Sequence, residues 1–123
     1  MLTILPHNYI GGGHQVITIA NVVISLFADY LTLIKPVSGT FSGKMASGVF
    51  ISVITNPIYF TFNGTAPATD GSAGHPLSVS QTLRLEGWDN VKLLKFIRQG
   101  SASGAIVVTP LFTTVNVTVP DPS

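Results

Sequence analysis

Stiff β-branched residues, divided into short runs by turn formers, dominate this chain. Valine, isoleucine and threonine supply 37 of its 123 residues, and 12 glycines and 8 prolines interrupt them at short intervals. β-branched side chains lose rotamer freedom in a helix and fit the pleated surface of a sheet. Short strands separated by turn signals are typical of a β-sandwich or a β-barrel. The sequence therefore predicts an all-β fold.

The expected strands are apolar or alternating runs that end at glycine, proline or asparagine. They cover residues 15–20, 22–27, 30–34, 49–54, 58–62, 82–85, 93–98, 104–109 and 112–119, with one more short strand at 40–42. A turn-rich loop is expected over residues 65–78. A single helical turn is expected near residues 88–92, where Asp89 offers a cap and Gly87 disfavours a longer helix.

Charged residues are scarce, since they make up 9% of the chain against about 25% in ordinary soluble domains. Six basic and five acidic residues leave a net charge of +1, so no basic surface for nucleic acid is expected. A membrane-spanning helix needs about 20 consecutive apolar residues, and Pro6 and the glycines at 11–13 interrupt the uncharged stretch before Asp29. We therefore expect a globular domain with an apolar surface buried in an assembly, and neither a nucleic-acid nor a membrane partner.

The two ends differ in composition from the middle of the chain. Residues 1–14 are expected to form an apolar arm with a hinge at three successive glycines, residues 15–119 the β-sandwich domain, and residues 120–123 a C-terminal tail. All charged residues except Asp121 lie between Asp29 and Arg98, so both ends are nearly free of charge. The candidate partner-binding residues are the apolar side chains of the arm: Leu2, Ile4, Leu5, Tyr9 and Ile10.

No pattern of reactive residues indicates catalysis. Glu86 and Asp89 are near neighbours, but this spacing also suits a polar turn between two strands. His7, His14 and His75 are too far apart in sequence for the usual ligand spacings of a metal site, and the chain has no cysteine. No serine lies in a Gly-x-Ser-x-Gly context. We expect no catalytic residue, no metal site and no cofactor.

Trp88 is the candidate surface aromatic. An indole ring offers a flat apolar face on which a sugar can stack. Tyr9 and Tyr59 are the other candidates for such a platform, and the three are not clustered in sequence. A tryptophan in the core or at an interface is the alternative interpretation.

The segment between residues 56 and 77 carries the clearest turn signals. Asn63 and Gly64 form a dipeptide that favours positive φ in a tight turn. Pro67 takes the chain out of the sheet, because proline cannot donate a ladder hydrogen bond. Gly74 permits a sharp reversal before the next strand. These four residues are predicted to form a structural turn.

Residues 46–112 resemble two related groups of proteins. The turn is similar to that of the β-sandwich modules appended to chitobiase-like enzymes. The closer resemblance is to small virion proteins of tailed phages, of the capsid decoration or cement type. It is carried by the strand at 51–53, the turn at 63–69, the reversal at 74–77 and the strand at 95–98. Asn63 replaces the aspartate of the usual turn, and the motif is structural, so it transfers no catalytic residue.

The resemblance implies an immunoglobulin-like antiparallel β-sandwich, to which this chain adds the extended N-terminal arm. It also implies a non-catalytic virion protein that is assembled in the bacterial cytoplasm and sits on the capsid surface. There it would bind the major capsid protein and copies of itself as a homo-oligomer, and so stabilise the shell. The alternatives are a component of the neck, tail or fibre base, or a carbohydrate-binding adhesion module with Trp88 exposed.

Overall fold

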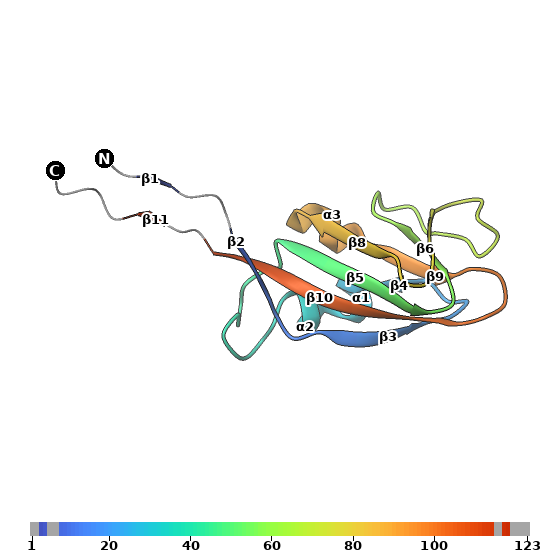
Figure 1. Ribbon diagram of the computed structural model, residues 1–123, viewed down its shortest axis with the longest axis horizontal. Helices are drawn as coiled ribbons and strands as arrows, with labels where there is room; N and C mark the ends of the chain where they lie inside the picture. Colours follow the sequence, from blue (N-terminus) through green and yellow to red (C-terminus); the bar gives the residue numbers. More distant parts are fainter. Residues whose placement is uncertain (1–2, 5–7, 115–116, 119–123) are drawn as a thin grey trace.

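The chain forms two antiparallel sheets that pack face to face as an all-β sandwich (Figure 1). The computed structural model describes residues 3–4, 8–114 and 117–118. The five-stranded sheet has the order β2 (Asn8–Gly11), β10 (Gly104–Thr114), β5 (Gly48–Thr55), β8 (Thr82–Glu86), with β3 (Gln15–Ile19) also paired to β10. The four-stranded sheet has the order β4 (Ile24–Ser25), β9 (Lys95–Arg98), β6 (Ile58–Thr61), β7 (His75–Leu77). The predicted all-β fold is confirmed, and the immunoglobulin-like topology stays a prediction.

Alternation along the strands produces the core. In β5, Val49, Ile51 and Val53 are buried between the sheets, while Phe50 and Ile54 point outward. β3 and β8 also alternate in burial, since strand side chains have a period of two, whereas β9 buries the neighbouring Phe96 and Ile97. The largest fully buried side chains are Phe96, Phe112, Ile17, Ile19, Leu26, Ile34, Ile51, Ile58, Leu94, Ile106, Val49 and Val91.

The strands expected at 22–27 and 30–34 are wrong. Only β4 (Ile24–Ser25) is extended, and the chain then forms two short helices, α1 (Leu26–Asp29) and α2 (Leu31–Ile34). Leu26 and Ile34 are fully buried, and Tyr30 and Leu33 pack against the core between them. These positions are spaced i, i+4, i+7 and i+8, which is the spacing of a helix face. The helical spacing becomes visible only over nine residues, whereas the strand prediction was based on alternation within runs of five or six.

Two other expectations are corrected near the sheet edges. No strand forms at 40–42, which is a turn. The loop expected over 65–78 contains β7 (His75–Leu77), whose Pro76 pairs with Tyr59 of β6. Proline is tolerated there because β7 is the last strand of its sheet and needs ladder bonds on one side only. The helix expected at 88–92 is confirmed as α3 (Trp88–Leu93), but its N-cap is Gly87, and Asp89 lies in the first turn without capping it.

β10 is one continuous strand, although two were expected on either side of Pro110. Pro110 pairs with Val49 of β5, and its carbonyl accepts the amide of Gly12 at 2.7 Å on the other side. The missing N–H of Pro110 faces the same side, where Gly12 continues the register of β2, so the return bond of this pair is absent. β10 continues through the proline because the lost bond lies at the end of the β2 ladder, where the partner of β10 changes to β3.

The N-terminal segment belongs to the same sheet as far as it is described. β2 pairs with Leu111–Thr114 of β10, directly after the stretch of β10 that pairs with β3. The glycines at 11–13 connect these two strands. On the N-terminal side of β2, β1 (Thr3–Ile4) pairs with β11 (Val117–Thr118). Within the described residues, no helix has the length and apolar character needed to cross a membrane.

Candidate interaction surface

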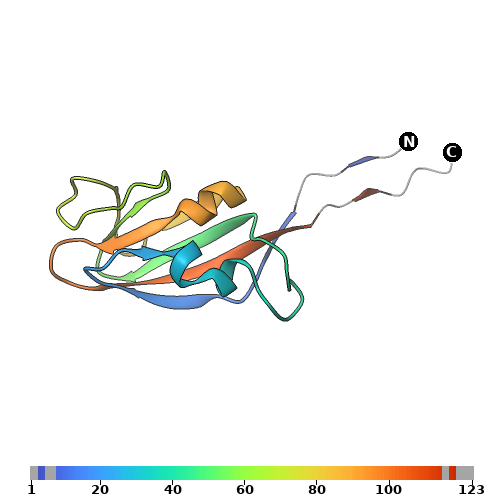
Figure 2. The same ribbon diagram turned by 180° about the vertical axis from the view of Figure 1, so that it is seen from behind.

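The two ends of the chain leave the sandwich together as a paired ribbon. β2 and the end of β10 run out of the body side by side, with the β1–β11 pair farther along (Figures 1 and 2). We call these four paired segments the terminal ribbon. Of the arm residues singled out from the sequence, Leu2 and Leu5 lie outside the described residues and Ile4 lies in β1. Tyr9 is half-buried and Ile10 is 46% exposed, both in β2.

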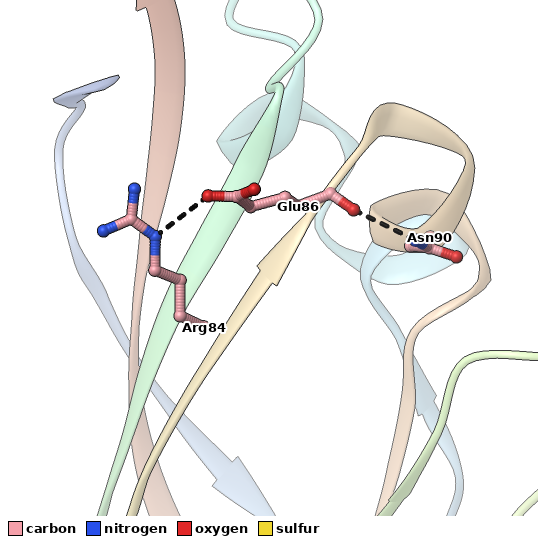
Figure 3. A network of polar contacts seen from close by, with 3 residues as sticks. All are labelled: Arg84, Glu86 and Asn90. Atoms are coloured by element: carbon pink, nitrogen blue, oxygen red, sulfur yellow. Dashed lines mark hydrogen bonds and ion pairs between the residues drawn. The ribbon is translucent and has the colours of Figure 1, made fainter. Parts of the chain in front are cut away.

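A cation–π contact fixes the base of the ribbon across the outside of the large sheet. The guanidinium carbon of Arg84 in β8 lies 5.0 Å from the centre of the Tyr9 ring in β2. Glu86 orients that guanidinium, since its Oε1 is 3.3 Å from Arg84 Nε, and the carbonyl of Glu86 accepts the side-chain amide of Asn90 at 3.0 Å (Figure 3). Both charged side chains are about half exposed, so the ion pair adds little stability by itself. Its effect is to hold the cation over the ring.

An aromatic stack fixes the other side of the ribbon base. Phe112 of β10 is almost fully buried and stacks on Phe41, with ring centres 4.3 Å apart and planes 6° apart. Gly12 approaches the same ring so closely that a Cβ atom would lie 2.8 Å from it. An open cleft of about 400 Å³ borders these residues, between the glycines at 11–13 and the loop at 36–41.

The outer face of the large sheet is apolar and nearly uncharged. The exposed apolar side chains on it are Val16, Phe50 and Ile54, at 57%, 40% and 45% exposure. The strand registers place Val107, Thr109 and Leu111 of β10 between them. Arg84 and Glu86, which pair with each other, are the charged residues that the described strands place on this face.

A groove opens between the two sheets where each sheet ends. β8 is the last strand of the large sheet and β7 the last strand of the small one. The groove has a volume of about 660 Å³, and its lining contains no aspartate, glutamate, lysine or arginine. Phe62, Leu83 and Leu85 are half-buried in its walls. His75 lies 5.4 Å from the Phe60 ring and 6.0 Å from the Phe62 ring, measured between ring centres.

The four turn residues predicted from the sequence lie together beside β6. Gly64 has φ 89°, and the Asn63 side chain accepts the amide of Thr65 at 3.1 Å. Pro67 is buried, and Gly74 has φ 123° directly before β7. A Cβ on Gly74 would lie 3.2 Å from Pro67, so the two close the loop against each other.

Trp88 is half-buried and packs against the core. Its ring meets the Phe27 ring edge-on, with centres 6.5 Å apart and an angle of 66° between the planes. Two rings at this angle do not form one flat stacking surface. Tyr59, another of the candidate platform residues, lies under Gly71 and Gly74 of the adjacent loop.

The titratable residues are dispersed. Within residues 3–4, 8–114 and 117–118, no three histidine or acidic side chains come together in a way that could hold a metal ion. Hydrogen bonds from Ser72 hold the pKa of Asp70 below its ordinary value of 3.8, and this carboxyl is fully exposed. Glu86 and Asp89 each pair with a neighbouring cation, Arg84 and Lys92 respectively.

The residues that attach the ribbon to the body carry no local signal in the sequence. Tyr9 was singled out, but its partner Arg84 lies in a strand 75 positions away. The stack of Phe41 on Phe112 joins a glycine-rich loop to the last long strand. Only the sheet order brings these pairs together, so no local pattern could have indicated them.

Comparisons with known proteins assign the chain to no family, so its class is defined by its architecture alone. No protein-family model matches the chain, and neither a curated protein nor a solved structure matches it. The structure defines a β-sandwich with a projecting terminal ribbon.

Proposed function

We propose that this protein is a structural subunit of a tailed-phage virion, attached to the capsid surface as a decoration or cement protein. The terminal ribbon is the observation that carries the proposal. It pairs the described segments next to the two chain ends, projects from the sandwich and contains no charged residue among its described strands. The turn and strand motifs that resemble tailed-phage virion proteins support the same assignment.

The proposed activity is binding without chemistry. A two-stranded ribbon is marginally stable by itself in water, so a partner surface that packs against it stabilises its paired form. A standard interface buries about 1,600 Å², and apolar burial contributes about 25 cal/mol per Å². Only the apolar part of that area contributes in this way, and it offsets roughly 4–15 kcal/mol lost when the partner is immobilised, together with the cost of ordering side chains. Ribbons lying across seams between capsid subunits would therefore resist separation of the shell.

The proposal is tested by deleting the gene from the phage that encodes it and measuring particle survival after heating or osmotic shock. Particles lacking the protein are expected to lose infectivity, and addition of the purified protein is expected to restore it. Ile10→Asp should abolish this rescue, because it places a charge on an exposed ribbon position. Val22→Asp is the matched control, since Val22 is 68% exposed in a turn outside the ribbon. Unchanged resistance of the deleted particles would overturn the cement function.

The position on the particle is a separate question that imaging answers. Density for the sandwich on the capsid lattice is the expected result. Density confined to the neck, tail or fibre base would replace the capsid assignment with one of those positions.

A further inference from the structure

We infer that the groove between β7 and β8 receives the N-terminal strand of the terminal ribbon from a second copy of this chain. The inference deepens the proposed function and rests on the ribbon as the attachment element. The inference predicts that the isolated protein associates with itself without a capsid, whereas the proposed function predicts only binding to the capsid. The two proposals therefore fail in different experiments.

The groove has the architecture of a site for an added strand. Its two walls end in β7 and β8, and neither edge pairs with a further strand among the described residues. β8 is the wall that accepts a strand, because an exposed edge carries unpaired N–H and C=O groups, whereas Pro76 removes one N–H from the edge of β7. The five residues of β8 offer a backbone edge at least as long as β2, which has four residues.

The lining of the groove selects an apolar occupant. Phe62, Leu83 and Leu85 leave part of their surface uncovered, and His75 lies beside the aromatic rings of β6 and its end. With no aspartate, glutamate, lysine or arginine in the lining, the groove offers a charged side chain no ion-pair partner of these types. A charged strand would lose its hydration there without gaining a partner.

The N-terminal strand matches that lining. No aspartate, glutamate, lysine or arginine occurs before Asp29, so the whole N-terminal segment is uncharged. β2 pairs with β10 on one side, which leaves its other edge open, and Ile10 is 46% exposed. An alternate side chain of this kind can enter a pocket while the backbone of its strand pairs with an edge.

The occupant must come from another copy. β2 and the end of β10 leave the sandwich at the end opposite to β6, which forms one wall of the groove (Figures 1 and 2). Within one chain β2 and β8 lie at opposite edges of the large sheet with β10 and β5 between them, so β2 cannot pair with β8 of its own chain. A contact between ribbon and groove uses two different surfaces, so it is heterologous and continues from copy to copy as a ring or a filament.

Cysteine cross-linking tests the contact directly, because the natural chain has no cysteine. Full-length Ile10→Cys and His75→Cys proteins are mixed in equal amounts and oxidised, and both positions are exposed. The expected product is a disulfide between the two variants. A mixture of Ile10→Cys with Val22→Cys is the control for random collision. A yield no higher than in that control would overturn the inference.

Sedimentation measured against protein concentration provides the second test. The wild-type protein is expected to form oligomers, and Ile10→Asp and His75→Asp should each weaken the association at least tenfold while Val22→Asp does not. A monomeric wild-type protein would overturn the inference, even if the particle rescue succeeds. If His75→Asp instead abolishes binding to the particle in a monomeric protein, the groove receives the capsid protein rather than a second copy, which also overturns it.

Discussion

At the scale of single residues, close packing at the ribbon base depends on Gly12. A Cβ at this position would lie 2.8 Å from the Phe112 ring and 3.1 Å from Pro110. The glycine is required by the space available, since its φ lies outside the left-handed region. Its neighbour Gly13 has nothing within 4 Å of a Cβ. Close packing therefore requires a glycine at position 12 and not at position 13, a difference that the run of three glycines in the sequence does not reveal.

Gly12→Ala is expected to lower the free energy of unfolding by about 1–3 kcal/mol, the usual cost of overpacking. The added methyl would displace Phe112 from its stack on Phe41. Urea denaturation of the purified protein measures the change. Gly13→Ala is the matched control, and it should leave the midpoint within experimental error or raise it slightly. Equal effects of the two substitutions would contradict the packing argument.

At the scale of elements, the spacing of apolar residues predicted secondary structure correctly where it fitted one period only. The prediction was wrong where the spacing fitted both the strand period and the helix period. The alternation in residues 49–54 correctly predicted β5, because half of that strand faces the core and half faces out. In residues 26–34 the same apolar types lie at helical spacing, and a run of only five residues fits both periods. In the two short helices Leu26 and Ile34 are both fully buried in the core.

The start of α1 provides a prediction at this scale. The hydroxyl of Ser25 accepts the amide of Ala28 at 3.2 Å, and Asp29 accepts the amide of Ser25 at 2.8 Å. This reciprocal cap satisfies two backbone N–H groups. Ser25→Ala is therefore expected to cost about 1 kcal/mol of stability, measured by thermal unfolding. Ser38→Ala, in an exposed loop, is the control and should cost less than about half of that. Equal losses would show that the cap contributes nothing.

At the scale of the whole molecule, the scarcity of charge determines which interactions are available. The five acidic and six basic residues lie outside the groove lining and outside the described strands of the ribbon. Contacts between these surfaces are apolar and backbone-mediated. Salt screens charge pairs but has little effect on such contacts.

The self-association of the wild-type protein is accordingly expected to change less than about twofold between 0.05 and 0.5 M sodium chloride, since exposed charges dominate the effect of salt. A mixture of Ile10→Lys with His75→Asp provides the contrasting case. The new pair of opposite charges should restore association between the two variants, and that association should weaken as salt is added. Sedimentation at each salt concentration measures both. A strong salt dependence of the wild-type protein would contradict an apolar contact.

The sequence by itself determined the fold class, most strand positions, the turn at Asn63 and Gly64 and the separation of charged and uncharged segments. These features depend on side-chain branching, backbone conformation and composition, which act within a few residues. The tertiary structure decided that the glycines at 11–13 join two strands of one edge, that Pro110 continues β10, and that Tyr9 meets Arg84. It also created the groove, because two sheet edges become neighbours only when the sheets pack. Contacts between distant segments depend on strand order, and local propensities do not encode strand order.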